Sequence, residues 1–204
     1  MPPRSFPSSA PSAAALLVLF GYLLHVNKAT ALVCLAAGLA LISTWIWKTP
    51  LERSTRVLGF KRPPARVMTA GLALGLATAA YARWAQGRPL FPCPLRAFLF
   101  ISISIGATEE LVFRGFFLGR FLDRWRPVAA VAAAALAHAA YKTAIFVPST
   151  ALAELALLGG LTFAFGLLLG WWRARNHGVW PCVAFHVVFD FWVYADRTTP
   201  WWVW

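Results

Sequence analysis

Residues 95–114 read LRAFLFISISIGATEELVFR, an apolar run that ends in two glutamates, Glu109 and Glu110, and an arginine, Arg114. A charged side chain at the depth of lipid hydrocarbon costs about 3 kcal/mol or more, so such residues usually face the interior of a helical bundle and take part in function. The stretch therefore supports two predictions: the chain is embedded in a membrane, and its charged residues belong to the functional site.

The composition of the whole chain supports the first prediction. Of its 204 residues, 60% are hydrophobic and 13% are charged, and the mean hydropathy is +0.64, whereas a soluble domain has about 25% charged residues. Several apolar segments are long enough for a helix to cross about 30 Å of hydrocarbon, and spans must be helices because unpaired backbone is not tolerated against lipid. We predict an all-α, polytopic transmembrane bundle of about seven spans (six to eight), at residues 13–26, 29–47, 67–85, 95–112, 128–147, 151–172 and 179–195.

The net charge of +12 comes from Lys and Arg residues that cluster between apolar runs. This pattern fits an anionic membrane leaflet better than nucleic acid, for which the sequence carries no motif. The stretches 48–66 and 114–126, with Arg173 and Arg175, fall on the same side as the N-terminus, which predicts a cytoplasmic N-terminus. Three arginines weigh against this orientation because it places them outside: Arg83, Arg88 and Arg96.

A proline-containing boundary near residues 62–65 suggests two parts within one integral membrane domain. We assign residues 1–94 to N-terminal transmembrane helices and a basic loop, and residues 95–204 to a helical core that carries the polar motifs.

On a helix, Glu110 and Arg114 are four residues apart and share a face, so they can form an ion pair. Glu109 lies about 100° away from that face, which leaves it free to act as a general base in an environment of low dielectric. The alternative is a structural ion-pair cluster at a helix end.

Later apolar segments carry further polar groups. His138 can line a water pocket or hydrogen-bond a neighbouring helix, and Lys142, one turn on, is expected to extend to the membrane surface. His186 and Asp190 are also one turn apart, so the carboxylate can orient the imidazole or simply lock helix packing. Cys182 shares the face of His186 and could in principle be a nucleophile, but Cys34 and Cys182 are expected to be small core residues.

In sequence order, these residues resemble the CAAX-type (type II) prenyl endopeptidase and bacteriocin-processing family of glutamic intramembrane proteases, which have an all-helical core. The resemblance covers about half of the chain and rests on this ordered set: Glu109-Glu110-x-x-x-Arg114, then His138, then His186-x-x-x-Asp190.

The resemblance implies a role for each residue. Glu109 is expected to be the general base that activates a water, with His138 holding that water. His186, with Asp190 beside it, is expected to donate to the carbonyl oxygen of the scissile peptide, while the pair of Glu110 and Arg114 supports the site. No cofactor is implied.

The chain departs from the family pattern at two positions. Ala134 stands where the family often has Phe, which is a packing difference. Asp190 stands where the family commonly has Asn, and an ionised carboxylate cannot donate a hydrogen bond to an oxyanion as an amide can. Asp190 can instead orient His186 or remain protonated.

Two other functions are consistent with the residues alone. Glu109, His138 and His186 could ligate zinc with a water in the fourth position, although the sequence has no His-Glu-x-x-His motif. Buried acids and histidines also form proton relays, so a transporter or scaffold subunit is the non-enzymatic alternative.

For a protease, we expect a membrane-embedded or membrane-anchored peptide or protein substrate, cleaved in prenyl-peptide or C-terminal tag processing. The small size and the Ala and Arg content suggest a bacterial inner membrane.

Overall fold

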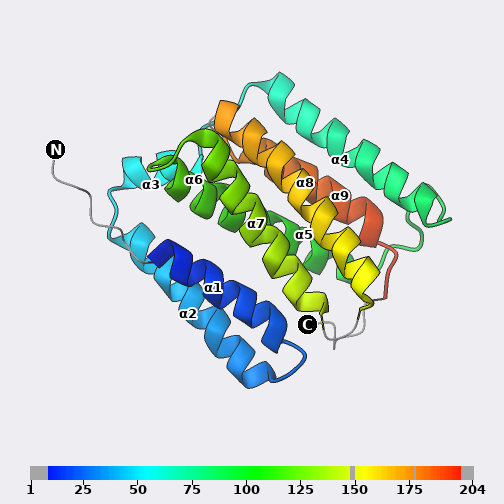
Figure 1. Cartoon of the computed structure of the whole chain (residues 1–204). Coiled ribbons are helices and arrows are strands. Elements are labelled where there is room, and N and C mark those ends of the chain that lie inside the picture. Colours follow the sequence, from blue (N-terminus) through cyan, green and yellow to red (C-terminus); the bar gives the residue numbers. More distant parts are fainter. Residues whose placement is uncertain (1–8, 148–149, 177, 199–204) are drawn as a thin grey trace.

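The computed structural model describes residues 9–147, 150–176 and 178–198, and the elements in these ranges are helices (Figure 1). In chain order they are α1 (Ser9–Leu23), α2 (Lys28–Trp47), α3 (Leu51–Leu58), α4 (Ala65–Ala85), α5 (Phe98–Glu110), the π-helix η1 (Leu111–Phe117), α6 (Leu118–Leu122), α7 (Pro127–Phe146), α8 (Leu152–Asn176) and α9 (Trp180–Tyr194).

The predicted all-α membrane fold is confirmed. Four helices are long and apolar enough to cross a membrane, namely α2, α4, α7 and most of α8, and α1 and α9 are shorter apolar helices. Helices α5, η1 and α6 follow one another without a break and form a seventh rod from Phe98 to Leu122. All seven predicted apolar segments therefore lie on helices, and the chain is an integral, multi-pass membrane protein.

Two stretches that we expected to be loops are partly helical. The stretch 48–66 contains α3, and the stretch 114–126 is helical as far as Leu122. Arg114 is consequently not a loop charge, because its side chain is 3% exposed and pairs with Glu110 inside the bundle. The basic loop between α6 and α7 is shorter than the sequence suggested.

Local signals explain where several helices begin and end. The side chain of Asn27 accepts a hydrogen bond from the backbone N–H of Thr30 and caps the start of α2. Helix α3 ends at Gly59, whose φ of 73° lies in the left-handed region that favours glycine. Helix α7 begins at Pro127, a position where the missing N–H costs no hydrogen bond.

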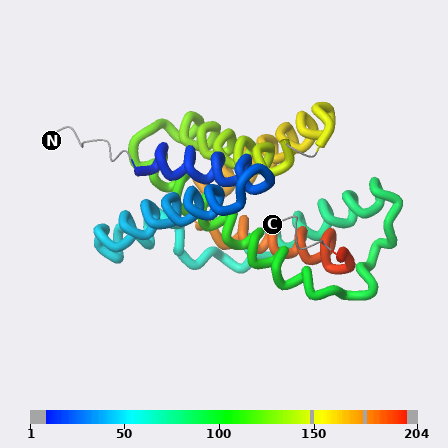
Figure 2. The backbone as a smooth tube through the Cα atoms, turned by 90° about the horizontal axis from the view of Figure 1, so that it is seen from below, coloured from blue at the N-terminus to red at the C-terminus, as the bar shows by residue number. Residues whose placement is uncertain are grey.

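The helices pack as two groups joined by the rod of α5, η1 and α6. Helix α1 packs against α2 and α7, and α7 packs against α8, whereas α9 packs against both α4 and α5. Figure 2 shows α1 and α2 on one side of the bundle and α4 and α9 on the other. Side chains of η1, including Phe113, Phe116 and Phe117, are buried in the apolar core.

Helices α4 and α9 approach each other more closely than side chains normally allow. A Cβ atom placed on Gly71 would lie 2.5 Å from the carbonyl oxygen of Pro181, and one on Gly75 would lie 2.5 Å from that of Phe185. Small residues four positions apart permit this backbone contact between membrane helices. Because α4 precedes residue 95 and α9 follows it, this packing joins the two parts into which we divided the chain.

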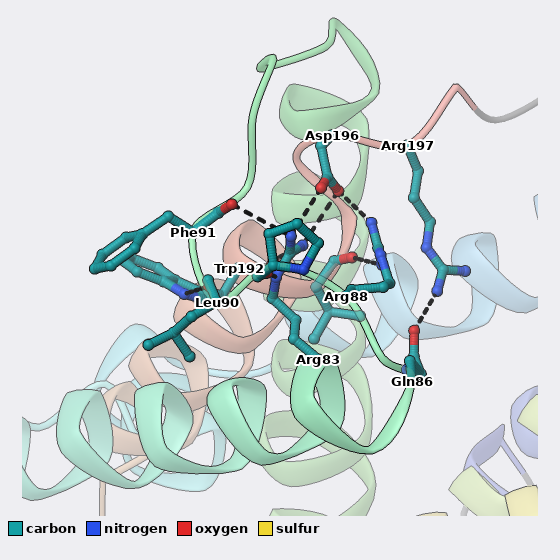
Figure 3. A network of polar contacts seen from close by, with 10 residues as sticks. Arg83, Gln86, Arg88, Leu90, Phe91, Trp192, Asp196 and Arg197 are labelled. Carbon is teal, nitrogen blue, oxygen red and sulfur yellow. Dashed lines mark hydrogen bonds and ion pairs between the residues drawn. The ribbon is translucent and has the colours of Figure 1, made fainter.

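A buried network joins the ends of α4 and α9 (Figure 3). Arg83 is fully buried and pairs with Asp196, with Nη2 2.8 Å from Oδ2, and Arg88 pairs with the same carboxylate. The remaining donors of Arg83 reach backbone oxygens, with Nε 2.5 Å from Pro89 O and Nη1 3.0 Å from Trp192 O. Two of the three arginines that weighed against the predicted orientation therefore have their charge partly balanced locally.

Candidate active site

Four helical elements bring together the polar residues that the sequence singled out. Glu109 and Glu110 end α5, Arg114 lies in η1, His138 is in α7, and His186 and Asp190 are in α9. Glu109 lies near the middle of the rod from Phe98 to Leu122, roughly 15–20 Å from either end. Lys142 and Asp190 lie nearer to helix ends, each four residues or about 6 Å from the last residue of α7 and α9 respectively.

Glu110, Arg114 and His138 form a chain of short contacts. Arg114 Nη1 donates to Glu110 Oε1 at 3.0 Å, which confirms the predicted pairing, and lies 2.7 Å from His138 Nδ1. A guanidinium only donates hydrogen bonds, so Nδ1 of His138 accepts one and the ring proton is on Nε2. The ring of Phe113 stacks on this imidazole with 4.4 Å between centroids and holds its orientation.

Glu109 is surrounded by three nitrogen-bearing side chains. Its Oε2 atom lies 3.3 Å from His138 Nε2 and 3.8 Å from His186 Nε2. Its Oε1 atom lies 2.7 Å from Lys142 Nζ. The three groups proposed from the sequence, Glu109, His138 and His186, therefore lie within reach of one bridging water.

The expectation for Lys142 is wrong. Its side chain is 23% exposed, and its ammonium pairs with Glu109 instead of extending to the membrane surface. Attraction between opposite charges is strong where the dielectric is low, which explains why the long side chain turns inward. Glu109 is for the same reason not the unpartnered carboxylate that the helix geometry alone suggested.

His186 contacts the site through both ring nitrogens. Nδ1 lies 2.8 Å from Glu110 Oε1 and donates to it, a contact that the sequence did not predict. Nε2 lies 3.7 Å from Asp190 Oδ1 and 3.8 Å from Glu109 Oε2, too far for direct hydrogen bonds. This nitrogen therefore lies between two carboxylates without a direct hydrogen bond to either of them.

Gly106 on α5 makes room for the side chains of Asp190 and His186 on α9. A Cβ atom at this position would collide with Oδ2 of Asp190 and lie 3.0 Å from Cδ2 of His186. The absence of a side chain here lets the polar face of α9 come close to α5.

The carboxylates of the site are not fully satisfied. Glu110 is fully buried, yet its Oε2 atom has no hydrogen-bond partner among the residues that the structure describes. Buried polar atoms are nearly always paired. A carboxylate oxygen of this kind can accept a further hydrogen bond.

The remaining residues behave as core residues. The thiol of Cys182 is buried and donates a weak hydrogen bond to the carbonyl oxygen of Leu169. Cys34 and Ala134 are buried in the main apolar cluster. Within the described ranges, no group of three or more His, Cys, Asp and Glu side chains is arranged to hold a metal ion. Chelation of the purified protein tests the zinc alternative.

One protein-family model matches the chain, over residues 91–192, and is described as Type II CAAX prenyl endopeptidase Rce1-like. The match begins before α5, ends within α9 and contains every residue of the polar cluster. No curated protein and no solved structure matches the chain. The match spans half of the sequence and agrees with the resemblance seen in the motifs, so the chain belongs to the Rce1-like family of type II CAAX prenyl endopeptidases and is a membrane-embedded peptidase.

Proposed function

We propose that this protein is an intramembrane endopeptidase in which Glu109 activates a water held between its own carboxylate and the imidazoles of His138 and His186. The observation that supports this proposal is the approach of both Nε2 atoms to Glu109 Oε2, at 3.3 Å and 3.8 Å. Peptide hydrolysis requires a base for water, a donor for the oxyanion and a proton for the leaving amine.

The water is deprotonated first. Lys142 binds Oε1 of Glu109 and leaves Oε2 directed at the two imidazoles. His138 donates from Nε2, because Arg114 already occupies Nδ1, and therefore orients the carboxylate. Glu109 takes a proton from the water as the water oxygen attacks the carbonyl carbon of the substrate. Lys142 is in this scheme a positioning residue for the base.

The developing oxyanion is stabilised by His186. Its Nδ1–H is held by Glu110, so in this scheme the ring carries a second proton, on Nε2, and acts as an imidazolium whose Nε2–H lies between Glu109 and Asp190. That N–H donates to the oxyanion, and Asp190, 3.7 Å from Nε2, balances the positive ring. Collapse of the tetrahedral intermediate breaks the C–N bond, and the proton held by Glu109 passes to the leaving amine.

The site depth restricts the substrate. Because Glu109 lies roughly 15–20 Å from either end of the α5–η1–α6 rod, we expect its substrate to be a chain held at the membrane. We infer a peptide or protein anchored by a lipid or an apolar tail, and the family match favours a prenylated C-terminal peptide.

The test is cleavage by purified protein in detergent, with a farnesylated reporter peptide and an unmodified peptide ending in an apolar helix. We expect wild type to cleave one of them and Glu109→Gln to be slower by about 10²- to 10⁴-fold. Glu154→Gln is the matched control, because that carboxylate is exposed on α8, and it should keep full activity. Full cleavage by Glu109→Gln would remove Glu109 from the role of base, whereas a loss of activity on chelation that zinc restores would favour a metal mechanism.

We also propose that the N-terminus is cytoplasmic, with the protein in a bacterial cell membrane. Native Cys93 tests the orientation, because it is exposed between α4 and α5 whereas Cys34 and Cys182 are buried. A membrane-impermeant maleimide should label Cys93 in intact cells. In a Cys93→Ser background, Arg66→Cys at the opposite end should react only after lysis, and the reverse pattern would invert the topology.

A further inference from the structure

A cavity of about 500 Å³ lies at the end of the bundle opposite Cys93, between α3, the end of α6, the start of α7 and the last turns of α8. Its walls include Arg56, Asp123, Trp171, Arg173 and Arg175. It is separate from the candidate active site, because Glu110 and Gly119, which borders the cavity, are nine residues apart on one rod, or about 13 Å.

The cavity carries an excess of positive charge. Arg56, Arg173 and Arg175 contribute three guanidinium groups, and none of them is in an ion pair within the described ranges. The one acidic residue in the wall, Asp123, pairs with Arg53 at 3.3 Å. The cavity therefore has three guanidinium groups in its wall beside one carboxylate, which is shared with a fourth arginine, Arg53.

Arg173 shows that the cavity is built rather than a chance gathering of surface charges. Its side chain is buried at 4% exposure, and its Nη2 donates to the carbonyl oxygen of Val57 at 2.7 Å, which fixes it against α3. Its Nε atom has no hydrogen-bond partner in the described chain. Asp123 attracts this charge but is paired with Arg53 at 3.3 Å, so an anion in the cavity would add a counter-charge for the buried Arg173.

The neighbouring residues suit a ligand at the membrane surface. Arg175 lies over the ring of Trp171 with 4.9 Å from Cζ to the centroid, a cation–π contact that orients the guanidinium. Trp171 is 37% exposed, as is typical of tryptophan where lipid meets water. The basic loops between the helices lie at this same end of the bundle.

We propose that this cavity binds the phosphate of an anionic phospholipid head group. Guanidinium groups bind phosphate through two parallel hydrogen bonds, and basic pockets at the membrane surface select anionic head groups. The acyl chains of the bound lipid would lie along the exposed apolar surface of the helices that border the cavity. This inference does not depend on the peptidase mechanism.

The experiment uses the full chain purified in detergent and counts bound lipid by native mass spectrometry. The added probes are phosphatidylglycerol, phosphatidylcholine and inorganic phosphate. The double variant Arg56→Gln/Arg175→Gln removes two exposed cavity arginines, and the double variant Arg66→Gln/Arg126→Gln removes two exposed arginines from the same end that do not line the cavity. The unfolding temperature of each protein is measured as well, so that weaker lipid binding can be distinguished from loss of folding.

We expect wild type and the Arg66/Arg126 variant to bind phosphatidylglycerol in preference to phosphatidylcholine. The Arg56/Arg175 variant should bind phosphatidylglycerol at least about tenfold more weakly, because each arginine near the surface contributes about 1 kcal/mol to anionic-lipid binding. Equal losses in both double variants would overturn the cavity as the site. Saturation by inorganic phosphate, with no preference between the two lipids, would overturn the lipid as its ligand.

Discussion

The cluster of Arg83, Arg88 and Asp196 and the cluster around Glu109 both hold buried charge, and they differ in how completely their groups are paired. In the cluster of Arg83, Arg88 and Asp196, one carboxylate serves two guanidinium groups, and the other donors of Arg83 end on backbone oxygens (Figure 3). In the cluster around Glu109, the Nε2 atom of His186 stands more than 3.5 Å from both neighbouring carboxylates. Burial of charge is common to both, so it does not by itself indicate catalysis.

The difference gives each cluster a distinct chemical character. Hydrogen bonds from Arg83 hold the pKa of Asp196 below its ordinary value, so this carboxylate stays ionised at neutral pH and fastens the loop before α5 to the end of α9. In the Glu109 cluster, Oε2 of Glu110 has no hydrogen-bond partner among the described residues, and Nε2 of His186 lies 3.7 Å from Asp190 Oδ1. A saturated cluster stabilises the fold, whereas an unsaturated one can accept a water and a substrate.

Removing a charge from the saturated cluster should have the largest effect on stability. We expect Arg83→Gln to lower the free energy of unfolding by about 1.5–3 kcal/mol, because Asp196 would keep Arg88 but lose its hydrogen bonds from Arg83. Thermal unfolding in detergent measures this loss, and the folded fraction should cleave the reporter at the wild-type rate. The control is Arg96→Gln, at an exposed position, which should change stability by less than about 0.5 kcal/mol.

Removing an imidazole from the Glu109 cluster should have the opposite result, a large loss of activity with a small loss of stability. We expect His138→Ala and His186→Ala each to reduce kcat by about 10²-fold or more, since each removes a donor to the water or the oxyanion. Rates at saturating reporter peptide, together with the unfolding temperature, distinguish a loss of catalysis from a loss of folding. Retained activity in either variant would assign that histidine to packing.

Lys142 occupies an intermediate position, because it pairs with the proposed base without facing the water. We expect Lys142→Met to lower kcat by about tenfold with KM unchanged, and Lys142→Arg to recover part of the rate by restoring the cation. Lys48→Met, at an exposed position near the end of α2, is the control for loss of a lysine. A change in KM alone would place Lys142 at the substrate rather than at Glu109.

The smallest effect is expected at Asp190. We expect Asp190→Asn to change kcat by less than about tenfold, because the amide keeps the shape of the side chain and adds a donor near His186. Steady-state rates across pH 5 to 9 measure it. A loss greater than a hundredfold would mean that the charge of Asp190 is needed to balance the imidazolium.

Much of this arrangement was predictable because it depends on local pattern. The seven apolar segments follow from composition and length, and the pair of Glu110 and Arg114 follows from their spacing of one helical turn. The convergence of Glu109, His138 and His186 could be anticipated, because a bundle with few interior polar groups brings them together.

Other features depend on tertiary packing and have no local signal. The contact of His186 with Glu110 joins residues 76 positions apart, and the contact of Arg83 with Asp196 joins residues 113 positions apart. The π-helical turn of η1 has no signature in its residues. The contact of Lys142 with the site did have a local signal, because its spacing of one turn from His138 places both side chains on the same helix face.

The backbone contact of α4 with α9 at Gly71 and Gly75 has a mechanical consequence. At these two positions no side chain lies between the helices to rearrange, so we expect α4 and α9, which carries His186, to move together. Opening of the bundle to a bulky substrate tail should therefore take place between other helices. Directed evolution of this enzyme toward new substrates should for the same reason retain Gly71 and Gly75 at the contact between α4 and α9.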